Sequence, residues 1–358
     1  MLECDALVVG GGPAGSTCAR ALRHAGWDVA VLDRARFPRD KVCAGWLTPH
    51  VLRALELDPA EYRRAGLTLQ AITGFQTGVF GQRTVETRYP SAVSYAIRRC
   101  EFDDFLLRRA DARVLEGAAL TSLRRDGDAW LANDLVRAGV VIGAGGHFCP
   151  VARHLRSRDE APDPVVAKEA EFRLEAPSSV EPGMPELLFC RDLEGYAWCV
   201  RKGDYINVGI GRRQNHGFGA HVEAFMTFLE RTGRAPGAAR ARWKGHAYLA
   251  SGAGSRPLVG DGLLLVGDAA GLAYPESGEG IRPAVESGLL AAETLLRAGR
   301  RPLTADLRPY ERRLRALYPD RQPSRGPLAG AVTALGRTLL RSRVFTRHVV
   351  IDRWFLRN

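Results

Sequence analysis

Residues 5–33, with the sequence DALVVGGGPAGSTCARALRHAGWDVAVLD, decide the fold. They open with Ala6–Val9, a short apolar run that is typical of a buried strand. The run leads into Gly10–Gly15, which fits the pattern Gly-x-Gly-x-x-Gly, and the residues that follow predict a helix that a glycine ends. Val29–Leu32 predicts a second strand, and Asp33 closes it.

Each part of this stretch has a physical role in holding a dinucleotide. Gly10 permits a tight turn, Gly12 lets the backbone approach a pyrophosphate, and Gly15 lets the helix pack close to the strand. The free N–H groups at the start of the helix bind the phosphates. Asp33, 18 residues after Gly15, is placed to accept a hydrogen bond from a ribose hydroxyl. The stretch predicts a dinucleotide site but leaves FAD and NAD(P) open, and a glycine-rich turn without a ligand is the alternative.

Composition narrows the class of protein. The chain has 358 residues, enough for about two domains, and no apolar run approaches the ~18 residues of a membrane span. It begins almost directly with a strand, so we expect no secretory signal. Its seven cysteines are never spaced Cys-x-x-Cys, which argues against a zinc site and a disulfide framework. We expect a cytoplasmic protein without a metal.

The net charge of +11 comes mainly from arginine. A GC-rich genome, an anionic substrate or an anionic membrane surface would each explain it. The sequence carries no zinc-finger or RNA-binding signature, so we expect no nucleic-acid partner.

A second stretch of chemistry occupies residues 263–292, LLLVGDAAGLAYPESGEGIRPAVESGLLAA. It resembles the second FAD-binding motif of the flavoproteins that include aromatic hydroxylases, flavin-dependent halogenases and geranylgeranyl reductases. In that family the Asp of a Gly-Asp pair binds a ribityl hydroxyl, and Asp268 matches it. A Pro-x-x-Gly-x-Gly-Ile stretch then places backbone N–H groups near the flavin ring, where a helix N-terminus stabilises negative charge on the reduced flavin. The resemblance implies non-covalent FAD.

Three further segments are similar to the geranylgeranyl reductases within that family. Arg99-x-x-Phe-Asp resembles the motif whose Arg approaches the FAD phosphates. Residues 41–45, KVCAG, resemble the Lys-x-Cys-x-Gly segment that lines the flavin. Residues 195–198, GYAW, resemble the start of the Tyr-x-Trp-x-Phe-Pro motif of the substrate domain. The implied FAD-binding residues are Gly10, Gly12, Pro13, Ala14, Gly15, Asp33, Cys43, Ala44, Gly45, Arg99, Ala119, Asp268, Gly278, Gly280 and Ile281, and Pro275 belongs to the same motif as the last four.

The expected fold class follows from these motifs and from the mostly β-type pattern between residues 165 and 211. It is α/β, a Rossmann-type FAD-binding domain with an inserted antiparallel β-rich substrate domain and a C-terminal helical tail. The expected boundaries are residues 1–68, 92–157 and 255–300 for the FAD-binding domain, 69–91 and 158–254 for the substrate domain, and 301–358 for the helical region.

Departures from the family pattern limit what the resemblance implies. Val200-Arg201 stands in place of Phe-Pro, which predicts a shorter or more polar ligand. Residues 143–146, GAGG, lack the acid of the family's Gly-Ala-Asp-Gly, so NADPH and reduced ferredoxin both stay open as electron donor. A halogenase would carry Trp where Tyr196 stands, and a catalytic lysine.

The resemblance therefore implies an oxidoreductase, and three functions stay open. The leading one is reduction of a carbon–carbon double bond in an isoprenoid or other apolar substrate, with hydride from FAD. Cys43, Tyr196 or water would supply the proton, and Cys43 is preferred although it can equally be a structural cysteine. Trp46, Tyr196 and Trp198 are candidate walls of a substrate cavity or plain core. The alternatives are an FAD-dependent monooxygenase acting on a small organic substrate, and a non-catalytic flavin-binding protein at a membrane.

The C-terminal tail has two interpretations. Apolar residues recur near helical spacing among arginines, namely Leu328, Val332, Leu335, Leu339 and Val344, with Trp354 after them. A basic amphipathic helix with tryptophan suits an anionic bilayer, which would make the protein peripheral at the inner membrane face. The same pattern suits a helix packed on the body of the protein.

Overall fold

The glycine-rich stretch forms the predicted strand, helix and strand. They are β1 (Leu2–Val9), α1 (Pro13–His24) and β2 (Val29–Asp33). Together with β8 (Arg113–Glu116), β11 (Val136–Gly143) and β18 (Leu263–Leu265) these strands form a parallel sheet in the order β18-β11-β1-β2-β8. This order is that of a Rossmann fold, whose ligands bind at the carboxyl ends of the strands.

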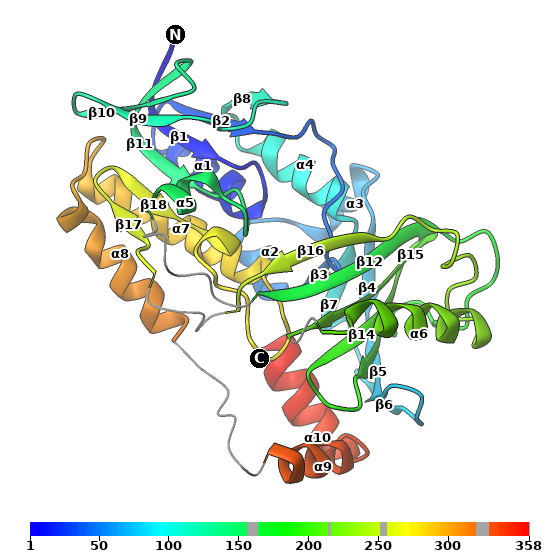
Figure 1. Ribbon diagram of the computed structural model, residues 1–358. Coiled ribbons are helices and arrows are strands. Elements are labelled where there is room, and N and C mark those ends of the chain that lie inside the picture. Colours follow the sequence, from blue (N-terminus) through cyan, green and yellow to red (C-terminus); the bar gives the residue numbers. More distant parts are fainter. Residues whose placement is uncertain (156–163, 214–215, 251–255, 320–328, 358) are drawn as a thin grey trace. The chain divides into compact units, whose positions relative to one another are not determined.

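The computed structural model describes residues 1–155, 164–213, 216–250, 256–319 and 329–357 (Figure 1), without the side chains of 329–332. Contacts group the described residues into two units. The first lies within Met1–Asp40, Cys100–Asp163 and Tyr248–Gln322, and the second within Lys41–Arg99, Pro164–Ala247 and Pro323–Asn358. Residues 41–68, expected in the FAD-binding domain, therefore pack with the β-rich unit. The expected boundaries at 157/158 and 254/255 lie outside the described residues.

Helices complete the first unit. These are α4 (Arg99–Arg109), α5 (Pro150–Leu155), α7 (Ile281–Ala298) and α8 (Thr304–Leu317). Helix α7 packs against α1 at very short range, since a Cβ on Gly288 would lie 2.5 Å from the carbonyl oxygen of Ala14. In the chain, β8 ends at Glu116, and the separate strand β10 (Ala129–Ala132) precedes β11.

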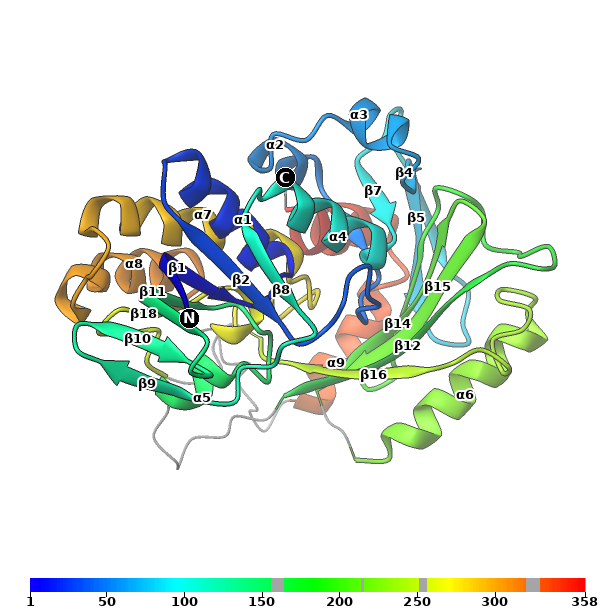
Figure 2. The same cartoon turned by 90° about the horizontal axis from the view of Figure 1, so that it is seen from above.

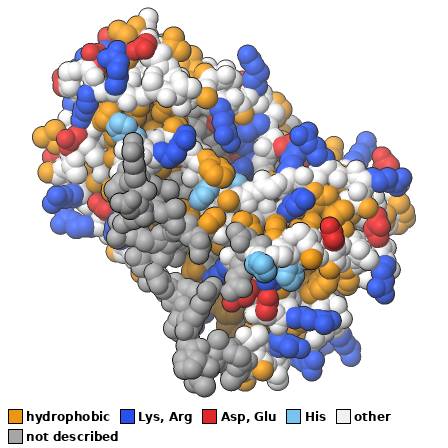
Figure 3. Space-filling model, viewed as in Figure 1, with side chains coloured by type: hydrophobic (Ala, Val, Ile, Leu, Met, Phe, Trp, Pro, Cys, Tyr) orange, Lys and Arg blue, Asp and Glu red, His pale blue; other side chains and the backbone are white. Residues whose placement is uncertain are grey.

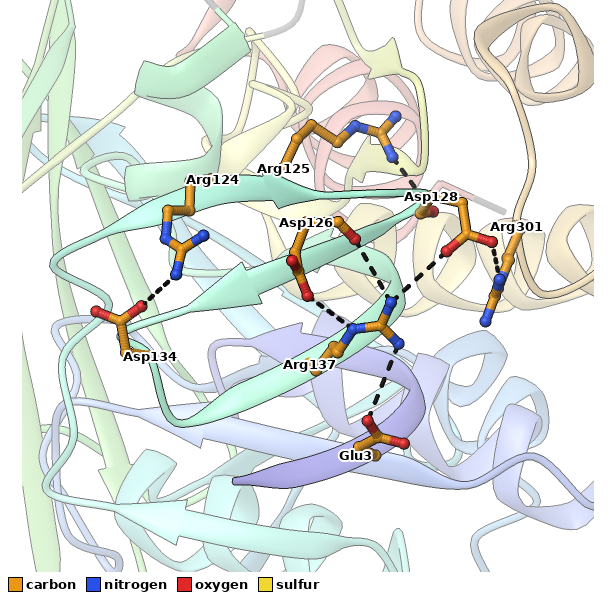
Figure 4. A network of polar contacts seen from close by, with 8 residues as sticks. All are labelled: Glu3, Arg124, Arg125, Asp126, Asp128, Asp134, Arg137 and Arg301. Atoms are coloured by element: carbon orange, nitrogen blue, oxygen red, sulfur yellow. Dashed lines mark hydrogen bonds and ion pairs between the residues drawn. The ribbon is translucent and has the colours of Figure 1, made fainter.

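Ion pairs lie along the hairpin of β9 (Leu123–Asp126) and β10 at the edge of this sheet (Figure 4). Arg137 Nε lies 2.8 Å from Asp126 Oδ2, and the same guanidinium approaches Asp128, which also pairs with Arg301. On the face that Figure 3 shows, Lys and Arg side chains are scattered instead of gathered in one patch. Some of the arginines therefore form local ion pairs with neighbouring carboxylates.

The second unit is built on a seven-stranded sheet in the order β16-β12-β15-β14-β13-β5-β6. Its strands are β5 (Gly74–Val79), β6 (Val85–Arg88), β12 (Val165–Arg173), β13 (Glu186–Phe189), β14 (Gly195–Lys202), β15 (Tyr205–Arg212) and β16 (Lys244–Tyr248). From β12 to β6 the pairs are antiparallel except β13 with β5.

Smaller elements complete this unit. A three-stranded sheet joins β3 (Trp46–Leu47), β7 (Ser94–Ile97) and β4 (Leu69–Ile72). Helices α2 (Pro49–Ala54) and α3 (Pro59–Arg64) lie between β3 and β4 in the chain.

The two faces of the large sheet are covered differently (Figure 2). Helix α6 (Phe218–Arg231) buries Phe225 and Leu229 against one face. The other face meets the C-terminal helices α9 (Ala329–Leu339), α10 (Arg343–Phe345) and the π-helix η2 (Thr346–Leu356).

The C-terminal tail packs on its own unit, as the second interpretation expected. Ile351, Phe355 and Leu356 are buried against the sheet, whereas Leu335 and Val344 are 60% and 69% exposed. Leu328 lies outside the described residues, and the side chain of Val332 is not described. No helix in the described part of the chain is long and apolar enough to cross a membrane.

The contact between α1 and α7 yields a stability prediction. Gly288→Ala places a methyl group against the Ala14 carbonyl, and overpacking of this kind costs about 1–3 kcal/mol of unfolding free energy. Gly219→Ala in α6 is the matched control, because its Cβ would meet no atom within 4 Å. Urea unfolding measures both variants. Equal midpoints for Gly288→Ala and the unmodified protein would contradict the predicted clash.

Candidate functional site

The glycine turn after β1 is closed against its own chain at two positions and open at a third. A Cβ on Gly10, whose φ is +118°, would lie 2.3 Å from Ala144 O, and a Cβ on Gly15 would lie 1.9 Å from Gly10 O. Around Gly12 the nearest atom to such a Cβ is Arg39 Nη2 at 3.5 Å. The N-cap residue of α1 is Gly12, which has no side chain to cap the helix. The turn therefore fits a pyrophosphate at Gly12, facing the free N–H groups of the helix.

Asp33 holds this turn as well as being placed for a ribose. Its Oδ2 accepts the N–H of Gly11 at 2.7 Å, and its Oδ1 accepts that of Ala35 at 2.8 Å. Ala119, also predicted to bind FAD, is exposed near the end of β2, and its carbonyl accepts a hydrogen bond from Asn133.

Arg39 is a candidate phosphate ligand that the sequence did not reveal. Its Nη1 lies 2.9 Å from Oδ2 of Asp103, which is fully buried, and its guanidinium lies over the ring of Phe37. This pairing fixes the arginine beside Gly12. Asp103 ends the Arg-x-x-Phe-Asp motif, and Arg99 of that motif is buried at the start of α4. Nothing in the arginine-rich run around Arg39 distinguishes it from its neighbours.

The two motifs of the first unit meet although more than 250 residues separate them. A Cβ on Gly267 would lie 3.0 Å from Cβ of Ala14, and the Gly267 N–H donates to Ser287 Oγ of α7. Asp268 then lies beside the N-terminus of α7, since its Oδ1 is 3.1 Å from a Cβ built on Gly280. Gly280 precedes Ile281, the first residue of α7. These donors and close approaches fit the phosphates and polyol chain of FAD.

The Pro275–Ile281 stretch is tightly shaped around Gly278. The φ of Gly278 is +67°, and a Cβ there would lie 2.2 Å from the hydroxyl of Tyr248. Its N–H donates to Tyr274 O. Only glycine fits this position, as the family motif requires.

In the second unit, residues 41–45 form a loop that we call the Cys43 segment. The Cys43 N–H donates to Glu169 Oε2 at 2.7 Å, and the Cys43 carbonyl accepts from Asn207 Nδ2 at 3.3 Å. Lys41 Nζ lies 2.8 Å from His246 Nε2 of β16. Gly45 has φ +67°, and a Cβ there would lie 2.1 Å from a backbone oxygen of β7. The sheet thus holds this segment from β12, β15 and β16, with Cys43 and Ala44 half-buried.

The three residues predicted to line a substrate cavity lie together. Side-chain alternation places Tyr196 and Trp198 on the sheet face that bears Phe75. Trp46 stacks on Phe75 with ring centroids 4.9 Å apart, and Phe355 of η2 contacts both Trp46 and Tyr196. We call these five residues the aromatic cluster. Trp46 Nε1 is buried and finds no hydrogen-bond acceptor among the described residues.

Arg201 does not face this cluster, so it does not support the prediction of a shorter or more polar ligand. It follows Val200, and alternation puts its side chain on the face covered by α6. Its guanidinium donates to Gly203 O instead. Val200, which is on the side of Trp198, is buried and apolar.

Charged residues that the sequence did not predict lie on or beside the same face. Lys202 is fully buried, with Nζ 2.5 Å from Glu171 Oε2, and Arg98 pairs with the second oxygen of Glu171. Glu169 is 5% exposed, and Asn207 donates to Glu171. We call these five residues the ion cluster. Acids two apart in a predicted strand were the available signal, because such residues share a face.

The two carboxyl groups of the ion cluster differ in proton affinity. Burial raises the pKa of Glu169 to about 7, although Lys202 and the Cys43 N–H favour its charged form. Burial also opposes ionisation of Glu171, but Lys202 and Arg98 outweigh it and hold the pKa of Glu171 below its usual range.

Comparisons with known proteins indicate the class of protein that this chain resembles. Residues 5–89 match the family model described as FAD dependent oxidoreductase. A menaquinone reductase of Mycobacterium tuberculosis is 31% identical over 58% of this chain and 55% of its own. A digeranylgeranylglycerophospholipid reductase of Methanocaldococcus jannaschii is 28% identical over 75% of this chain and 70% of its own. The chain resembles the geranylgeranyl reductase-like FAD-dependent oxidoreductases. The predicted resemblance, fold class and FAD dependence are therefore confirmed.

Solved structures share the fold. A geranylgeranyl bacteriochlorophyll reductase-like protein from Thermoplasma acidophilum has a TM-score of 0.73 at 21% identity, covering 95% of this chain and 88% of its own. A probable FAD-dependent monooxygenase from Pseudomonas aeruginosa has a TM-score of 0.66 at 20% identity, covering 95% and 96%. The match to the mycobacterial relative spans about half of that relative's length.

Glu169 generates a prediction for pH and stability. Its pKa of about 7 exceeds the ordinary 4.5, so the folded protein keeps a proton that the unfolded chain releases between these values. The contribution of Glu169 to stability is therefore present below pH 4.5 and is lost as pH rises to about 7. Glu169→Gln removes this loss, and its unfolding free energy relative to the unmodified protein should rise by at most about 3 kcal/mol from pH 4 to pH 8.

Denaturant unfolding across this pH range measures the difference. Glu175→Gln is the control, since Glu175 is exposed just beyond the end of the same strand. A constant difference between Glu169→Gln and the unmodified protein at all pH values would contradict the raised proton affinity.

Proposed function

We propose that this protein is an FAD-dependent reductase of carbon–carbon double bonds in an isoprenoid or other apolar substrate. The observation that carries the proposal is that the aromatic cluster adjoins the Cys43 segment on one sheet face. Trp46 follows Gly45 in the chain, and Asn207 bonds both Cys43 O and Trp198 Nε1. An apolar, aromatic-lined surface of this kind suits an apolar ligand.

Bound FAD would supply the hydride. The Gly10–Gly15 turn and Arg39 would bind its pyrophosphate, Asp33 a ribose hydroxyl, and Asp268 the ribityl chain. The N-terminus of α7 would favour negative charge near its ring. The aromatic cluster would orient the substrate and exclude water, and the Cys43 thiol would hold the proton for the second carbon of the double bond, with Tyr196 or water as alternatives.

The names of the relatives support an apolar substrate, since they are reductases of menaquinone and of a geranylgeranyl-bearing phospholipid. The buried N–H of Trp46 would bond an oxygen of such a substrate. NADPH or reduced ferredoxin would supply electrons. The protein would act in the cytoplasm. The exposed Leu335 and Val344 of its C-terminal region would contact the inner face of the membrane.

Turnover on a panel of prenyl lipids tests the proposal. The full chain is loaded with FAD and given dithionite as reductant, and mass spectrometry looks for products heavier by two hydrogens. Substrate that co-purifies with the protein is identified in the same way. Saturated product supports the reductase. Tight FAD binding without product from any lipid would favour a non-catalytic flavin-binding protein.

Cys43→Ala and Cys43→Ser test the proton donor. Both should keep FAD, because the segment is held through backbone atoms of Cys43, but lose turnover by about 10²-fold or more. Cys100→Ala, a half-buried cysteine in α4, is the matched control. Flavin absorbance reports binding and product formation reports turnover. Unchanged turnover in the Cys43 variants would remove this thiol from the mechanism.

The monooxygenase is the outcome against which the reductase is tested, because a monooxygenase shares the fold. Reduced protein is mixed with air-saturated buffer and a small aromatic substrate, and products are identified by mass. We expect no product that has gained an oxygen atom from O2. A hydroxylated product formed with matching oxygen consumption would overturn the reductase proposal.

A further inference from the structure

Glu169 is a buried acid to which the proposed reaction assigns no role. It lies on β12, on the sheet face that carries the aromatic cluster and the ion cluster. Register pairs it with Gly209, and Gly209 in turn with Trp198, so the three occupy one row across the sheet. Its Oε2 accepts the Cys43 N–H at 2.7 Å. A carboxylate thus ends directly on the backbone of the segment proposed to carry the proton donor.

The charged and titratable groups near Glu169 lie on several neighbouring elements. Lys202 of β14 lies close to the segment, since its Nζ would be 2.7 Å from a Cβ built on Gly45. Glu171 lies two residues along β12 and takes the ammonium of Lys202 and the guanidinium of Arg98. From the edge of the sheet, β16 contributes His246, which bonds Lys41 of the segment.

With both acids ionised, the ion cluster holds two negative and two positive side chains. Lys202 and Arg98 both contact Glu171, whereas Glu169 accepts the neutral N–H of Cys43. Glu169 is consequently the member that a proton neutralises first, in agreement with its raised pKa of about 7.

We propose that Glu169 is a positioning residue whose ionised carboxylate holds the Cys43 segment through the Cys43 amide, and that uptake of a proton by Glu169 loosens this segment. The consequence for catalysis rests on the proposed function. A hydrogen bond to a charged acceptor is roughly twice as strong as one to a neutral acceptor, so neutralisation weakens the anchor without removing it. The protonation state of Glu169 would then control the position of Cys43, the proposed proton donor.

Hydrogen exchange of the full chain tests this, with and without added FAD. Mass spectrometry follows peptides that contain the amides of residues 43–45 at pH 6 and pH 8, corrected for intrinsic exchange rates. In the unmodified protein we expect about tenfold more protection at pH 8 than at pH 6. Glu169→Gln should show the pH 6 level at both pH values. Glu175→Gln, whose acid is exposed, should behave as the unmodified protein.

Two results would overturn the proposal. One is equal protection of the segment in Glu169→Gln and the unmodified protein at pH 8. The other is a loss of protection in Glu169→Gln that is the same at pH 6 and pH 8, since that indicates general loosening instead of control by a proton. The experiment needs no turnover, so its outcome is independent of whether the protein proves to be a reductase.

Discussion

The amide of Asn207 is the contact on which the second unit's candidate site depends. Its Oδ1 accepts the indole N–H of Trp198, and its Nδ2 donates to the carbonyl of Cys43 and to Glu171. One fully buried side chain therefore satisfies groups of the aromatic cluster, the Cys43 segment and the ion cluster at once. A buried polar network of this kind is rigid when every member is bonded, and costly when one is lost.

The first unit depends on a different constraint, which is the absence of side chains. Gly15 and Gly288 bring α1 within reach of the β1 turn and of α7, and Gly267 brings the Asp268 turn against Ala14. These close approaches converge at the carboxyl ends of β1 and β18, where a doubly wound sheet binds its ligand. Close packing, together with the hydrogen bond from Gly267 to Ser287, thus joins the two glycine-rich motifs.

A single sheet face combines the two environments that the proposed reduction would use. Apolar aromatic rings suit a lipid-like substrate, and the adjoining charges hold the loop that carries Cys43. Trp198 separates the two, with its indole lying flat over Gly209, where a Cβ would be 2.2 Å from the ring. The buried lysine and acids are tolerated there because they neutralise one another.

The sequence alone determined the nucleotide-binding half, because strand, turn and helix are local in the chain and the glycine spacing follows from backbone sterics. It also determined the pairing of Tyr196 with Trp198, since period two in a strand is local as well. Only the tertiary structure decided that Arg39 lies beside Gly12, that Arg201 faces away from the aromatic cluster, and that the tail buries Phe355. It alone assembled the ion cluster. Those contacts join residues far apart in the chain, and their partners are chosen by sheet order and register, which no local pattern specifies.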